Sequence, residues 1–214
     1  MVSHTPKQET SQVGRFIHLG LRPSSSHDDR HIDLLLCDVA GEHFSNFTSH
    51  ADEATQQRMA FLHRCDGFVL VVDALALHGP KGRHLDAELA RMAGRLLDVL
   101  REGLRRDVPI AVALSKADAV PELPRDAAAL RELVERRAPR LATALRRAES
   151  EQIPHELFAV AAIPQSGQPF GVQQCFGHLL GHVDRRARWP RWTTPIPEPP
   201  HSSFLAMRTR KDEP

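Results

Sequence analysis

The chain has 214 residues, of which 41% are hydrophobic and 26% are charged, and its formal net charge at pH 7 is +1. This length suits one α/β domain with a full core, and the balanced charge removes the usual electrostatic argument for nucleic acid as the main partner. No apolar run approaches the ~18 residues that a membrane span needs, and Cys37, Cys65 and Cys175 lack metal-ligand spacing. We therefore expect a cytoplasmic protein with reduced thiols.

Short apolar runs and amphipathic segments predict strands and helices in chain order. Strands are expected at residues 14–21 and 31–39, joined by a polar segment into a hairpin. Further strands are expected at 68–73, 108–114 and 157–163, and the first of these is predicted to be buried on both faces. Helices are expected at 52–64, 82–106, 126–147 and 173–188.

Alternation of later strands and helices predicts an α/β fold, a mostly parallel sheet with helices on both faces. The hairpin should add one antiparallel edge strand, and the helix at 126–147 should break or kink at Pro139. We expect an N-terminal arm at 1–13, one domain at 14–188, and an extended or disordered Pro-rich tail at 189–214. Binding residues in such sheets follow the carboxyl ends of the strands.

Three of these strand ends carry residues suited to a nucleotide. The second strand ends in D-V-A-G-E, where Asp38 can hold Mg²⁺ through water and Gly41 lets a backbone N–H approach a terminal phosphate. The strand at 108–114 ends in S-K-A-D, where Asp118 can accept two hydrogen bonds from guanine while the stem of Lys116 covers the base. In the A-A-I that ends the last strand, a backbone N–H can meet the guanine oxygen. Each motif alone also fits a cap or turn, but their order and spacing favour a nucleotide site.

In order and spacing these motifs resemble those of P-loop GTPases of the Ras-like class, over about residues 5–188. Within that class the chain looks more like the bacterial double-GTPase proteins than like a eukaryotic small GTPase. The resemblance implies binding and hydrolysis of GTP with Mg²⁺, and protein partners reached through two switch loops. It implies these roles: Asp38 for Mg²⁺, Gly41 for the terminal phosphate, Lys116 and Asp118 for guanine, and Ala162 for its backbone contact.

The resemblance also implies a switch threonine and a water-positioning residue. Thr10, with Thr5 as the alternative, is the candidate whose hydroxyl and carbonyl reach Mg²⁺ and phosphate. Glu42 stands where many relatives carry a glutamine that orients the attacking water. Its charge is repelled by a triphosphate, so hydrolysis should be slow or need a partner. Ser115 replaces the usual Asn or Thr and Ala161 the usual Ser, which weakens guanine selectivity and leaves ATP open.

The phosphate loop of that class, G-x-x-x-x-G-K-[ST], does not occur in these 214 residues. The G-P-K-G at 79–82 has no Ser or Thr after its lysine, and its proline lacks an N–H, so it is a turn. The first strand of the class, central in its sheet, is missing as well. Two explanations stay open. The chain is the downstream part of a longer protein, which its abrupt start favours, or it is a degenerate relative acting as a nucleotide-free pseudo-GTPase interaction module.

Histidines offer a weaker alternative, a metal site. His178 and His182 lie four residues apart on a predicted helix, close enough to share a metal ion. We expect these histidines to lie at surface or boundary positions rather than in a zinc site.

Overall fold

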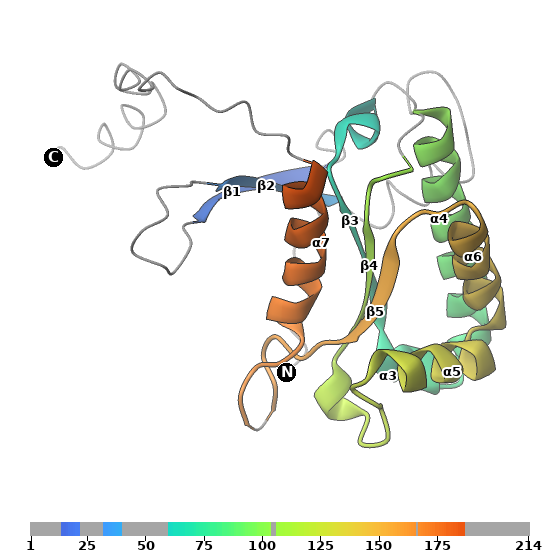
Figure 1. Ribbon diagram of the computed structural model, residues 1–214. Coiled ribbons are helices and arrows are strands. Elements are labelled where there is room, and N and C mark those ends of the chain that lie inside the picture. The colour runs from blue at the N-terminus through green and yellow to red at the C-terminus, as the bar shows by residue number, and fades with distance from the viewer. Residues whose placement is uncertain (1–13, 22–31, 40–59, 104–105, 166, 187–214) are drawn as a thin grey trace, which may run out of the picture.

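The computed structural model describes residues 14–21, 32–39, 60–103, 106–165 and 167–186 (Figure 1). They form a mixed α/β fold with two sheets. The larger is parallel, in the order β3-β4-β5, and the smaller is an antiparallel pair, β1 and β2. The strands are β1 (Gly14–Leu21), β2 (Ile32–Val39), β3 (Phe68–Asp73), β4 (Ile110–Ser115) and β5 (His155–Ala159).

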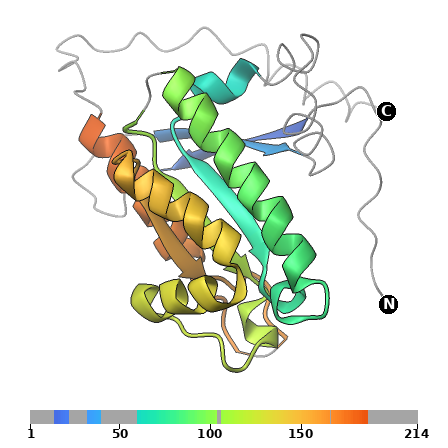
Figure 2. The ribbon, with the colours of Figure 1, turned by 90° about the vertical axis from the view of Figure 1, so that its right-hand side faces the viewer.

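Helices cover both faces of the parallel sheet, as the sequence predicts (Figure 1). On one face α4 and α6 run side by side, with α5 at their end (Figure 2). On the other face α7 packs against β4 and β5. The helical segments are η1 (Ala60–Arg64), α3 (Ala74–His78), α4 (Gly82–Glu102), η2 (Ala117–Ala119), α5 (Ala127–Arg137), α6 (Pro139–Ser150) and α7 (Val172–Arg186).

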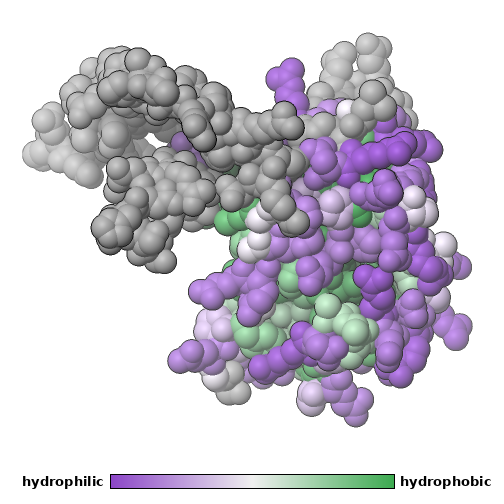
Figure 3. Space-filling model, viewed as in Figure 1, coloured by the Kyte–Doolittle hydropathy of each residue, from purple (hydrophilic) through white to green (hydrophobic). Residues whose placement is uncertain are grey.

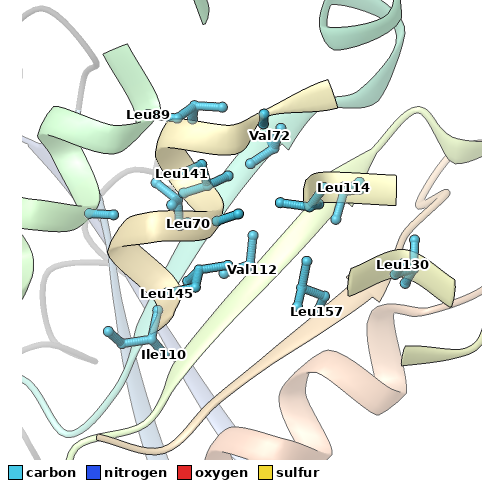
Figure 4. Close-up of a cluster of buried hydrophobic side chains, with 14 of the residues drawn as sticks. Leu70, Val72, Leu89, Ile110, Val112, Leu114, Leu130, Leu141, Leu145 and Leu157 are labelled. Carbon is cyan, nitrogen blue, oxygen red and sulfur yellow. The ribbon is translucent and has the colours of Figure 1, made fainter. Parts of the chain in front are cut away.

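The main core lies between the parallel sheet and the α4–α6 layer. Alternate strand residues such as Val72, Val112 and Leu157 point into it and meet Leu89 of α4 and Leu141 of α6 (Figure 4). The other face of β4 and β5 forms a smaller cluster with α7. The middle strand β4 is therefore buried on both sides, which explains why it is apolar throughout from Ile110 to Leu114.

The expectation that β3 is buried on both faces is wrong. Leu70 and Val72 are buried, but Val69 is 38% and Val71 62% exposed. The helix on that side, α7, packs on β4 and β5, and the outward side chains of β3 stay at the surface. On the side seen in Figure 3, hydrophobic residues reach the surface between a majority of hydrophilic ones. An apolar run alone does not reveal which of its faces a helix covers.

The hairpin forms as predicted, in a register that pairs Gly14 with Val39 and Leu21 with Ile32. It does not add an edge strand to the parallel sheet, because within the described residues β1 and β2 pair only with each other. Side chains make its contacts to the rest of the domain instead. The rings of Phe16 and Phe61 meet edge to face, with their centroids 6.2 Å apart.

The predicted break at Pro139 is confirmed, because α5 ends at Arg137 and α6 begins at the proline. Proline fits the first turn of a helix, where its missing N–H is not needed. The backbone N–H groups of Leu141 and Arg140 donate to the buried carboxylate of Asp86 in α4, at 2.9 and 3.3 Å. This carboxylate caps α6 from a neighbouring helix and so fixes how α4 and α6 pack.

Several predicted segments fall partly or wholly outside the described residues. Of the helix expected at 52–64, only residues 60–64 are described, as the short 3₁₀ segment η1. The predicted arm at 1–13 and tail at 189–214 lie outside as well. No helix in the described ranges is both long enough and apolar enough to cross a lipid bilayer.

Candidate functional site at the carboxyl edge of the sheet

The three parallel strands end side by side, so the segments that follow them meet at one edge of the sheet. Asp73 at the end of β3 pairs in register with Ser115 at the end of β4, and Leu114 pairs with Ala159 at the end of β5. The following segments, α3, η2 and residues 160–165 and 167–171, lie at the lower end of the sheet in Figure 1. The sequence predicted the base-binding half of a nucleotide site here.

Lys116 stands directly after β4, in the left-handed conformation with φ 56°. Its ammonium Nζ lies 2.6 Å from Oδ2 of Asp73. The residues on either side are tied to the neighbouring strands. The hydroxyl of Ser115 donates to the carbonyl of Val72 at 3.1 Å, and the N–H of Ala117 donates to the carbonyl of Val160 at 3.1 Å. The turn that carries Lys116 is thus held from both sides.

Asp118 joins this turn to the segment after β5. Its Oδ2 accepts the backbone N–H of Gln165 at 2.9 Å. Gln165 comes three residues after Ala162, the residue predicted to give a backbone contact to the base. The structure therefore places Lys116 and Asp118 in one turn and links that turn directly to the segment of Ala162.

The segment after β5 is itself closed into a tight loop. Ala161 and Phe170 exchange two backbone hydrogen bonds of 3.0 Å, and the guanidinium of Arg125 lies 4.1 Å from the centre of the Phe170 ring. Gly171 follows with φ +79°, and a Cβ there would come within 1.9 Å of the carbonyl oxygen of Ala159. Only glycine fits at this position, and it lets the backbone that leads into α7 pass close to the end of β5.

Asp73 is a site residue that the sequence analysis missed. Partial burial raises the pKa of its carboxyl, but the hydrogen bonds from Lys116 and from the N–H of Ala76, with the lysine charge, outweigh burial and hold that pKa below its ordinary value. Its Oδ1 caps α3 by accepting the N–H of Ala76 at 2.9 Å. Its position at a strand end beside S-K-A-D was the signal that could have identified it.

The Mg²⁺ and phosphate half of the predicted site is only partly described. Asp38 lies in β2, opposite Arg15. No hydrogen bond or ion pair within the described ranges joins Asp38 to Lys116 or Asp118. The other predicted residues of this half, Thr10 with its alternative Thr5, Gly41 and Glu42, lie outside the described residues.

The two helical histidines gain a partner that sequence spacing did not reveal. His178 Nδ1 lies 3.0 Å from Oε2 of Glu156 in β5, and the rings of His178 and His182 are 4.7 Å apart. Burial, followed by the charge of His182, lowers the pKa of His178 against the opposing effect of Glu156. In the part of the chain that the structure describes, no three His, Cys, Asp or Glu residues are placed to hold a metal ion.

The layered fold, with a Ser-Lys-Ala-Asp turn tied to the loop after the next parallel strand, fits an α/β domain of the GTPase-related class. Comparison of the sequence with family models agrees. The model of the Double-GTPase 2 family matches residues 1–168, most of the chain, and the chain therefore belongs to this family. The matched range includes every residue predicted for the nucleotide site. A search of curated proteins finds no match.

Proposed function

We propose that this chain is a guanine-nucleotide-binding domain whose base site is the turn 115–118 together with the loop after β5. The observation that carries the proposal is the contact between the Asp118 carboxylate and the backbone N–H of Gln165. This contact supports the proposal because it holds the Asp118 carboxylate beside the segment of Ala162, and these are two of the residues proposed to bind the base. Membership of the Double-GTPase 2 family supports a nucleotide as the ligand.

The chemistry of Asp118 favours guanine. An ionised carboxylate has about four acceptor positions, and one of them is used by Gln165. The remaining positions can accept the N1–H and the exocyclic amine of guanine. Adenine has no donor at the equivalent ring nitrogen, so it would leave an acceptor unpaired. The methylene stem of Lys116 can lie over the base while its ammonium is held at Asp73.

At the phosphate end the proposal assigns Asp38 and Thr10 to Mg²⁺, Gly41 to the terminal phosphate and Glu42 to the attacking water. Mg²⁺ held there would neutralise charge on the phosphates, and Glu42 would orient the water that attacks the terminal phosphorus. Switch loops that respond to the terminal phosphate would present the surface for a protein partner. Glu42 brings a negative charge to this point, so we expect slow turnover in the absence of a partner.

A second candidate function is a nucleotide-free pseudo-GTPase that acts as a protein-interaction module. One observation favours it: the 214 residues contain no G-x-x-x-x-G-K-[ST] motif. The backbone N–H groups and lysine of such a loop normally bind the β-phosphate. The two candidates differ in whether the protein binds nucleotide at all.

Titration of the full chain with fluorescent GDP and fluorescent ATP, in the presence of Mg²⁺, separates the two candidates. We expect saturable binding with preference for GDP, and a loss of about 30-fold or more in Asp118→Ala, since its hydrogen bonds to the base are worth ~2 kcal/mol or more. Glu132→Ala, which removes an exposed carboxylate of α5, is the matched control and should bind like the wild type. A folded protein that binds neither nucleotide would contradict the proposal and support the interaction module.

A further inference from the structure

The ion pair between Asp73 and Lys116 joins the ends of two neighbouring strands. Asp73 ends β3 and Lys116 follows β4, yet Oδ2 and Nζ are only 2.6 Å apart. The lysine side chain is 60% exposed and the aspartate side chain 34% exposed. A pair this accessible contributes little to folding stability, so its main effect is on where the two side chains point.

Asp73 is fixed more firmly than Lys116. It lies in a hydrogen-bonded strand pair, and its second oxygen, Oδ1, is held by the N–H of Ala76 at 2.9 Å. Lysine, in contrast, has a flexible four-carbon stem, and on the exposed side of a turn it has many rotamers. The anchored carboxylate therefore selects the direction of the lysine stem.

The same turn carries a second carboxylate. Asp118 is two residues further along the same turn, and only one of its oxygens is engaged by Gln165 within the described residues. A released ammonium would pair with Asp118 and compete with the guanine donors for its oxygens. The lysine stem would then also leave its place over the base.

We infer that Asp73 is the positioning residue of the base site: it draws the Lys116 ammonium across to β3, keeps the stem in place for the base, and leaves the Asp118 carboxylate open. The inference rests on the proposed guanine-nucleotide function. In this role Asp73 acts on GDP affinity only through Lys116.

A double-mutant cycle on GDP affinity tests this role. Asp73→Asn removes the charge but keeps a side-chain oxygen to cap α3, and Asp73→Ser keeps the cap in a shorter side chain. We expect each to weaken GDP binding about 3- to 10-fold, whereas Asp73→Asn should change affinity less than 2-fold when introduced into Lys116→Met. Asp73→Glu, which restores the carboxylate, should recover part of the loss. Added salt should weaken the wild type more than Asp73→Asn.

The possible outcomes distinguish failure of this inference from failure of the proposed guanine-nucleotide function. Unchanged GDP affinity in both Asp73→Asn and Asp73→Ser would overturn the inference, and so would an equal loss of affinity with and without Lys116. If Asp118→Ala still weakens GDP binding in that case, the proposed function stands. Loss of the thermal unfolding transition in both Asp73 variants would show a purely structural residue and also overturn the inference. A wild-type protein that binds no guanine nucleotide overturns the function and the inference together.

Discussion

Asp86 and Asp73 both accept hydrogen bonds from distant parts of the chain, but in very different surroundings. Asp86 is 4% exposed and holds the first backbone N–H groups of α6 against α4. Asp73 keeps a third of its side chain in solvent and holds an exposed lysine at the carboxyl edge of the sheet. The comparison teaches that burial decides what such a contact does. A buried carboxylate fixes the packing of helices, and an exposed one can only direct a neighbouring side chain.

The largest effect is expected when Asp86 is removed. Asp86→Ala leaves the buried N–H of Leu141 and the partly buried N–H of Arg140 without their acceptor, which should lower the free energy of unfolding by about 2–4 kcal/mol. Urea unfolding followed by circular dichroism measures this loss. Asp126→Ala, which removes the more exposed cap of α5, is the control and should cost only ~1 kcal/mol. An equal cost for the two variants would break the distinction between buried and exposed carboxylates.

Gly171→Ala tests whether the loop after β5 is held close to the end of that strand at Gly171. A Cβ at this position would come within 1.9 Å of the Ala159 carbonyl oxygen, on a backbone with φ +79°. We expect a loss of about 1–3 kcal/mol in unfolding free energy and, because the loop after β5 must shift, weaker GDP binding. Gly177→Ala on α7, where a Cβ meets nothing within 4 Å, is the matched control. Unchanged unfolding and binding in Gly171→Ala would show that the loop is not held at this point.

The smallest effect concerns α7, on the opposite face of the sheet from Asp86. Burial lowers the pKa of His178 below its ordinary value, although Glu156 opposes the shift and His182 and His155 add to it. The unfolded chain then takes up a proton before the folded one, so the stability contributed by neutral His178 is present above the unfolded pKa, near 6.5, and is lost as the pH falls below it. One proton changes stability by at most about 1.4 kcal/mol per pH unit.

Urea midpoints measured at pH 7.5 and pH 5.5 check the direction. The wild type should be less stable at pH 5.5, and His178→Gln should reduce that difference. His84→Asn, at an exposed position of α4, should leave it unchanged. If His178→Gln kept the full pH dependence, the titrating group would lie elsewhere and the buried face of α7 would not be pH-sensitive.

Local patterns in the sequence predicted much of the fold. The strands at 14–21 and 68–73, the start of α4 at Gly82 and the break at Pro139 follow from apolar periodicity and from the missing N–H of proline. The S-K-A-D turn was expected at the end of a parallel strand, and it is there. These features depend on a few consecutive residues, which is why a single sequence is enough to find them.

The candidate site was predictable only in part. The side chains proposed to bind the base form a short motif, but their partners Asp73 and Gln165 come from other strand ends. Glu156 beside His178 was missed for the same reason, because β5 and α7 bring the two side chains together. Such partners are set by the register of the sheet and by helix packing, which no local pattern shows.

By itself the sequence determined the order and type of the main strands and of the long helices α4 and α7, the S-K-A-D turn after β4 and the position of the helix break, because each is fixed by local backbone preferences and hydrophobic period. Only the tertiary structure decided that β3 exposes Val69 and Val71, that Asp86 caps α6, and that Asp73 holds Lys116. These outcomes depend on which surfaces meet in space. The physical reason is that burial and long-range hydrogen bonds belong to pairs of elements, whereas the sequence describes one element at a time.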